Sequence, residues 1–242
     1  MLEGVQLAAA WAVTGGICRT SHAALYNETG WETLAKRRDK QRLKLLYKII
    51  NGLTPGYLHS LIPTNVSSRN TYNVRSKDNI SQVHARTSMY SNSFIPAAIR
   101  QWNTLPLSVR NSEDLETFQR KLNKDKPKAN DLYYFGNRNV NIIHSRIRMG
   151  CSQLNQHMFR IGVTSSPGCA CGASLENTYH YFFVCPLYTN ERNTLQLAIM
   201  SIPNVSFTLN TALNGNSKCS KADNLAIFEA VHKYIVNTGR FT

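Results

Sequence analysis

A chain of 242 residues, 42% of them hydrophobic, is long enough to bury one large core or two small ones. No apolar run approaches the roughly 18 residues of a membrane span, so we expect no membrane partner. Lys and Arg number 28 against 14 Asp and Glu, and the net charge of +14, with a pI near 9.7, favours attraction to polyanions.

The first segment, MLEGVQLAAAWAV, admits two interpretations. A signal peptide would use the apolar stretch from Ala8 to Val13, but a signal peptide needs a positive start and the only early charge is Glu3. Val5, Ala8 and Ala12 recur at helical spacing, which favours a packed helix. We therefore expect a protein of the nucleus and cytoplasm that is not secreted, so that its thiols stay reduced.

The segment over 32–55, ETLAKRRDKQRLKLLYKIINGLTP, predicts a helix of about five turns that ends at Gly52 and Pro55. Leu43, Leu46 and Tyr47 have the spacing of a buried face. Seven cations stand against one acid in residues 36–48: Lys36, Arg37, Arg38, Lys40, Arg42, Lys44 and Lys48. Four of the lysines recur every fourth residue and can meet several phosphates at once. A solvated charged face is the alternative, but the excess of cations favours nucleic-acid contact.

The middle of the chain alternates between polar and helical segments. We expect a polar linker over 65–92, as loop or extended structure, and a helical segment over 93–124. Its second helix, NSEDLETFQRKLNK, places acids in the first turn and cations in the last, as the helix dipole favours. Residues 120–128 form a second basic stretch, and residues 125–137 are expected to be a second linker. The two basic stretches hold twelve of the 28 cations, so the charge is patched.

The stretch CACGASLENTYHYFFVCP has the spacing C-x-C-x8-H-x4-C, formed by Cys169, Cys171, His180 and Cys185. Structural zinc sites use four thiolate and imidazole ligands in a tetrahedron. Gly172 lets the chain double back after the first two cysteines, and Pro186 takes Cys185 out of helical geometry. Simple packing is the alternative, since cysteine is among the most buried residue types. Four ligands in this order and a reduced compartment favour a zinc-knuckle-like subdomain over 138–200.

Such a zinc ion would be structural. A catalytic zinc keeps an open position, whereas three thiolates and one imidazole close the tetrahedron, and the sequence lacks a His-Glu-x-x-His pattern. LENTYHYFFV predicts a short helix with Tyr179, Phe182 and Phe183 on its buried face. Tyr181 and Tyr188 are left off that face, where they can stack on bases or pack in the ordinary way.

The last element is a C-terminal helix within 218–242, with Ser220 and Asp223 in a capping-box pattern and Phe228 and Val231 facing the core. The expected fold is therefore mainly α: helical bundle-like segments, a small zinc-knuckle-like subdomain and long polar loops. Residues 1–64 would form one helical region that carries the basic helix.

Nearly the whole chain resembles the region after the polymerase core in reverse transcriptases of LINE-type (non-LTR) retrotransposons. The resemblance rests on the order of four segments: LEGVQLAAAWAVTGG, LYNETGWETLAKRRDKQRLKLLYKIINGLTPGYL, SFIPAAIRQWNTLPLSVRNSEDLETFQRKL and CACGASLENTYHYFFVCPLYTNER. Complete proteins of this family carry an endonuclease, a polymerase core and a cysteine-bearing segment, and copy element RNA into DNA at a nicked target. The resemblance implies that Cys169, Cys171, His180 and Cys185 match the family's Cys-Cys-His-Cys positions. It also implies that residues 1–64 are thumb-adjacent.

The chain departs from that family in its acidic residues. Polymerase chemistry needs paired metals held by clustered carboxylates, but the sequence has no Asp-Asp pair, and Glu113–Asp114 lies at a helix start. We therefore expect the chain to have no catalytic activity. We also expect that Met1 lies inside a longer ancestral reading frame, and that the missing polymerase core of the parent protein is a partner of this chain. The leading hypothesis is a truncated module that is stabilised by a structural zinc ion and binds RNA and/or DNA. The alternative is a decayed or repurposed fragment that acts as a protein-interaction domain.

Overall fold

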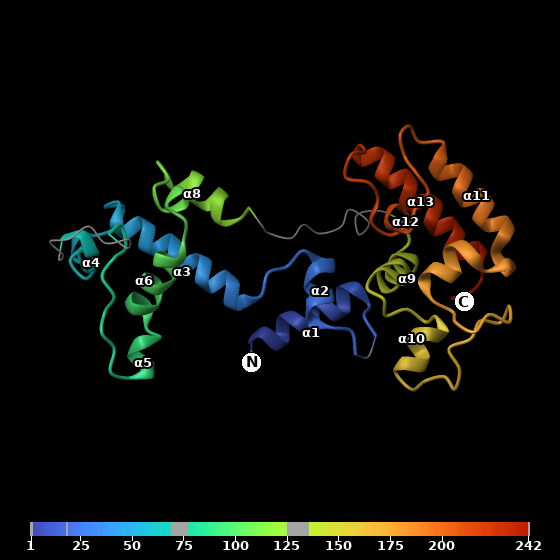
Figure 1. Ribbon diagram of the computed structural model, residues 1–242, viewed down its shortest axis with the longest axis horizontal. Helices are drawn as coiled ribbons and strands as arrows, with labels where there is room; N and C mark the ends of the chain where they lie inside the picture. The colour runs from blue at the N-terminus through green and yellow to red at the C-terminus, as the bar shows by residue number, and fades with distance from the viewer. Residues whose placement is uncertain (1, 18, 69–76, 125–135, 242) are drawn as a thin grey trace. The chain divides into compact units, whose positions relative to one another are not determined.

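The computed structural model describes residues 2–17, 19–68, 77–124 and 136–241 (Figure 1). These residues are mostly helical, and Asn65 and Ile80 form an isolated antiparallel bridge in place of a sheet. The expectation of a mainly α fold is confirmed. Among the described residues, none of the helices combines the length and apolarity that crossing a membrane requires. The chain divides into a central unit, residues 32–126, and a C-terminal unit, residues 1–31 with 127–242.

The central unit is built on α3, which begins after Thr33, whose side chain accepts a hydrogen bond from the Lys36 amide. Its core joins α3, α6 and α8 through Tyr47, Trp102 and Phe118, and the Tyr47 and Phe118 rings stack at 4.5 Å. The helices of this unit are α3 (Leu34–Ile50), α4 (Gly56–His59), η1 (Val66–Ser68), α5 (Ser88–Ser91), α6 (Phe94–Thr104), α7 (Leu107–Arg110) and α8 (Leu115–Leu122).

Part of the expected linker over 65–92 packs onto the central core. Ile80 is buried, and the side chain of Asn103 on α6 bonds both its amide and its carbonyl, at 3.0 and 2.8 Å. Residues 69–76 of this linker lie outside the described residues, as do residues 125–135 of the second linker with Lys126 and Lys128.

In the C-terminal unit, α13 lies against α9, α11 and α12, and its Phe228, Val231 and Tyr234 are buried. Ser220 and Asp223 form the expected capping box at its start. The helices here are α1 (Leu2–Thr14), α2 (His22–Thr29), α9 (Arg138–Arg148), α10 (Asn155–Arg160), η3 (His180–Val184), η4 (Pro186–Tyr188), α11 (Thr189–Met200), α12 (Leu209–Asn214) and α13 (Lys221–Asn237).

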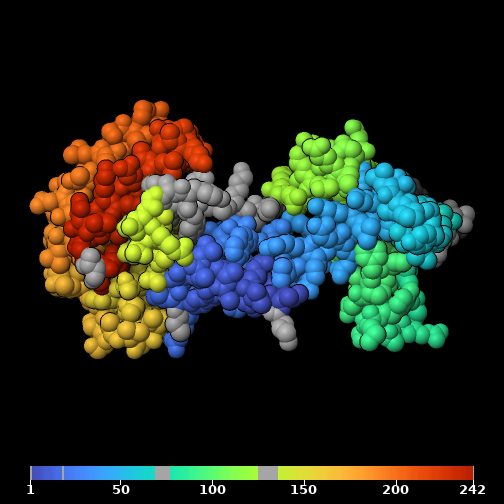
Figure 2. Space-filling model, turned by 180° about the vertical axis from the view of Figure 1, so that it is seen from behind, coloured from blue at the N-terminus to red at the C-terminus, as the bar shows by residue number. Residues whose placement is uncertain are grey.

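The first two helices belong with the end of the chain, whereas the sequence grouped residues 1–64 as one region. Helix α1 packs against α2 and α9, as Figure 2 shows where the blue N-terminal segment meets the yellow-green one. Arg148 on α9 forms a buried ion pair with Glu28 on α2, at 2.9 Å. Arg146 donates to the carbonyl of Gly15, at 2.6 Å. These contacts join segments more than a hundred residues apart, which local sequence patterns do not record.

Candidate metal centre and basic surface

Cys169 and Cys171 lie on a tight turn. The Cys169 amide donates to the Ala173 carbonyl at 2.9 Å, and the Gly172 amide donates to the Cys169 carbonyl at 3.0 Å. Gly172 has a φ of +93°, in the region that only glycine adopts without strain. The glycine therefore closes the turn that carries the first two sulfurs.

His180 and Cys185 lie at the two ends of a single π-helical turn, η3. The Cys185 amide donates to the His180 carbonyl at 2.8 Å, an i to i+5 bond, and the Asn177 side chain accepts from the His180 amide at 2.7 Å. Arg192 on α11 donates to the carbonyls of Phe182 and Cys185 and so supplies partners to the end of the turn. Single π turns of this kind occur frequently at functional sites.

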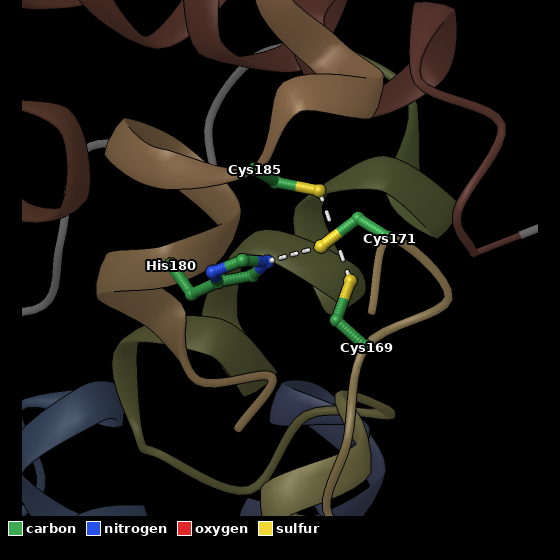
Figure 3. A group of neighbouring side chains, drawn as sticks. All are labelled: Cys169, Cys171, His180 and Cys185. Atoms are coloured by element: carbon green, nitrogen blue, oxygen red, sulfur yellow. Dashed lines mark hydrogen bonds between the residues drawn. The ribbon is translucent and has the colours of Figure 1, made fainter. Parts of the chain in front are cut away.

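The four side chains converge on one centre (Figure 3). Their three sulfurs and one imidazole nitrogen all lie within 4.8 Å of one another. Sγ of Cys169 lies 3.7 Å from Sγ of Cys185, too far for a disulfide bond of about 2.05 Å. Sγ of Cys171 lies 3.3 Å from Nε2 of His180. The cluster could hold a metal ion.

The protonation of the thiols differs with their surroundings. Burial raises the pKa of Cys169 to about 12 and also raises the pKa of Cys185. The Ala173 amide lowers the pKa of Cys171. Deprotonating all three sulfurs in so small a volume needs a compensating positive charge, which a divalent cation bound there would supply.

A buried ion pair fixes the loop beside the cluster. Glu176 is 2% exposed, and Arg240, just beyond α13, reaches its two carboxylate oxygens at 2.7 and 2.6 Å. The Asn155 amide at the start of α10 donates to the same carboxylate, at 2.8 Å. The pair thereby joins the metal-site loop to the end of the chain.

The interpretation of Tyr181 as a side chain left free to stack on bases is wrong, because Tyr181 is fully buried. Its hydroxyl and that of Thr238 lie 2.7 Å apart, and its ring packs edge-on against those of Tyr234 and Tyr188. Tyr188 itself is half-buried. Tyr179, expected to be buried, is 57% exposed and stacks on Phe183. The error arose because the α-helical period does not apply to a π turn.

The basic residues of α3, all predicted to contact nucleic acid, differ in how far they are exposed to solvent. Lys36, Arg37 and Arg38 are exposed, whereas Lys44 and Lys48 are half-buried. The Lys40 side chain is only 12% exposed, because its Nζ lies 2.5 Å from Glu32 and 2.9 Å from Oδ1 of Asn123. Arg42 pairs with Asp39 at 2.9 Å. Lys40 and Arg42 are therefore committed to contacts within the central unit.

Several residues that support the cluster could not have been predicted from a local sequence pattern. Arg240 lies 64 residues from Glu176, and Arg192 contacts carbonyl groups, which every residue carries. Asn177 could have been found, since an Asn directly before a helix commonly caps it by accepting from the amide three residues further on.

Comparison of the chain with protein-family models, with curated proteins and with solved structures finds no match. The metal centre and the exposed cations therefore carry the functional proposal.

Proposed function

We propose that the chain is a nucleic-acid-binding module in which a structural Zn²⁺ holds the C-terminal unit and exposed cations of the central unit contact phosphates of RNA or DNA. Its resemblance to LINE-type reverse transcriptases supports the view that it is the C-terminal, non-catalytic part of such an enzyme.

The geometry of the cluster suits zinc. A tetrahedron with Zn–S near 2.3 Å and Zn–N near 2.05 Å has edges of about 3.8 Å between sulfurs and about 3.6 Å between sulfur and nitrogen. The observed distances of 3.7 Å between Cys169 and Cys185 and 3.3 Å between Cys171 and His180 are close to these edges. Thiolate and imidazole together are the ligands zinc prefers, and four of them leave no position for a reacting water.

The phosphate contacts are supported by one observation: the hydrogen bond between Lys40 and Asn123, at 2.9 Å. It joins the first half of α3 to the end of α8, so the described part of the second basic stretch, residues 120–124, lies beside the first, as the green segment on α3 shows in Figure 2. We call the exposed cations of these two stretches that the structure describes the basic surface: Lys36, Arg37, Arg38, Arg120, Lys121 and Lys124.

A surface of this kind binds phosphates without reading sequence. Each neutralised phosphate releases counterions, so affinity for a nucleic acid falls with salt at a log–log slope of about 0.7–0.9 per phosphate. Two acids beside it are already paired, since Glu32 lies 2.5 Å from Lys40 and 3.7 Å from Lys36, and Asp39 binds Arg42. The cations of the basic surface outnumber these acids, so a net positive charge remains.

The test is a salt titration of nucleic-acid binding, followed by fluorescence anisotropy, for the full chain with zinc bound. In the variant Lys36→Gln, Arg38→Gln, Lys124→Gln we expect the slope to fall by up to about 2–3 units, since three phosphate contacts are removed.

The matched control removes three exposed cations of the C-terminal unit: Lys218→Gln, Lys221→Gln, Lys233→Gln. Net charge changes equally, so we expect the slope to stay near that of the unaltered chain. An equal decrease of the salt slope in the two variants would show that binding depends on overall charge, and would contradict the assignment of phosphate contacts to the basic surface. Absent or salt-insensitive binding, with zinc retained, would favour a protein-interaction fragment instead.

A further inference from the structure

A groove of about 520 Å³ lies between α10 and the loop that carries the metal ligands. It falls within the range of about 300–1,000 Å³ that small-molecule sites occupy. Its principal lining side chains come from both sides: Leu154, His157, Phe159, Arg160, Pro167 and Leu175. Neither the metal centre nor the basic surface uses it.

His157 gives the groove a hydrogen-bond acceptor. Nδ1 of its ring lies 3.0 Å from the Ser152 carbonyl, which can only accept, so Nδ1 carries the proton. Burial lowers the pKa of His157, and the ring is therefore neutral at pH 7. Nε2 keeps a lone pair and makes no hydrogen bond to any residue that the structure describes. The groove thus suits a ligand with an N–H or O–H group.

The other lining groups favour an aromatic ligand next to an anion. Phe159 is 48% exposed and Arg160, beside it, is exposed. Among the described residues that line the groove, Glu176 is the one acid, and Arg240 and the Asn155 amide neutralise it, so it does not repel an anion. An aromatic side chain, an acceptor and an unopposed cation match a base and its phosphate.

The loop that carries two of the candidate metal ligands forms one wall of the groove. Pro167 accepts a hydrogen bond from the Glu176 amide at 2.8 Å, which closes the loop that contains Cys169 and Cys171. Asn155 on α10 donates to the Gly168 carbonyl at 2.5 Å. Because the loop is short and bears two of the ligands, removing the ion is expected to release this wall.

We propose that this groove binds one unpaired base of a single strand of nucleic acid. Phe159 stacks on the face of the base, Nε2 of His157 accepts an N–H from its edge, and Arg160 contacts the adjacent phosphate. This inference rests on the proposed function and adds a contact of a different kind, since the basic surface meets phosphates and the groove meets a base.

The experiment compares two fluorescein-labelled strands of equal length, oligo(dT) and its abasic counterpart, which has the same phosphates and no bases. Oligo(U) in a third arm distinguishes RNA from DNA. The full chain with zinc is expected to prefer the base-bearing strands. Phe159→Ala is expected to weaken their binding about 5- to 150-fold, the usual range for one stacked base, and to leave the abasic strand unaffected.

Tyr179→Ala is the matched control, because Tyr179 is an exposed aromatic residue of the same unit that does not line the groove. It should alter neither affinity, and a chelator should abolish the preference for bases. Equal affinity of the unaltered chain for both strands, or an unchanged preference in Phe159→Ala, would overturn the groove and leave the proposed function standing. Failure to bind either strand would contradict the proposed function itself.

Discussion

Replacing Arg240 with Gln would test how the metal-site loop is held. Arg240 donates two hydrogen bonds, at 2.7 and 2.6 Å, to the carboxylate of Glu176, whose side chain is 3% exposed. Without the guanidinium, the charge of Glu176 stays buried and loses its main partner. Helix α13 offers a control in the pair of Lys233 and Glu229, which lies at 3.2 Å with both side chains more than 60% exposed.

The expected cost follows from burial. Removing one partner of a buried ion pair costs about 3–5 kcal/mol of unfolding free energy. The Asn155 amide still bonds Glu176, and the Arg240 side chain is 23% exposed, so we expect the lower limit, about 3 kcal/mol. Lys233→Gln should cost less than about 0.5 kcal/mol, as exposed i,i+4 pairs do.

The assay is urea unfolding of the zinc-loaded chain, followed by circular dichroism, with both variants measured against the unaltered protein. Arg240→Gln should lower the midpoint clearly and Lys233→Gln hardly at all. If the two variants unfold within about 0.5 kcal/mol of each other, the reasoning about the buried pair is refuted.

Three further outcomes are expected. Gly172→Ala should destabilise the chain by about 1–2 kcal/mol, because its φ is +93°. Gly4→Ala, in the first turn of α1 where an added Cβ meets nothing within 4 Å, should stabilise the chain by up to about 0.5–1 kcal/mol. The same sign for both variants in thermal unfolding would contradict this expectation. Burial lowers the pKa of His144 well below 6.5 and that of His232 to about 4, so the folded state binds fewer protons than the unfolded chain. The contribution of these neutral histidines to the free energy of unfolding should therefore be complete above pH 6.5 and be lost as the pH falls toward 4. Urea midpoints measured across this pH range should fall less steeply in His232→Gln than in the unaltered chain. Chelation should open residues 165–195 to proteolysis before the rest of the chain, and an unchanged cleavage pattern would count against a structural ion.

Local patterns predicted much of this fold. The apolar period of Leu43, Leu46 and Tyr47 placed α3, and the Ser220–Asp223 pattern located the start of α13. The Cys and His spacing predicted that four ligand atoms would meet, since a close pair on a turn and a pair at the two ends of a short segment need little long-range information.

The remaining features depend on contacts between distant residues or on an irregular turn. The packing of α1 on α9 and the ion pair between α2 and α9 join residues far apart in the sequence, so local spacing does not predict them. The π turn at η3 reversed the exposure of Tyr179 and Tyr181, because the prediction assumed α-helical geometry. Lys40 was predicted to meet phosphate, but Glu32 and Asn123 hold it, and only the tertiary structure brings Asn123 close.

Native mass spectrometry of the full chain tests the central claim most directly. We expect one zinc ion per chain, which a chelator removes, and less than one in Cys171→Ser at the same zinc concentration. Cys219→Ser, which alters a cysteine away from the cluster, should keep the full complement. A chain that carries no zinc under native conditions, or that retains it in Cys171→Ser and loses it in Cys219→Ser, would contradict the account.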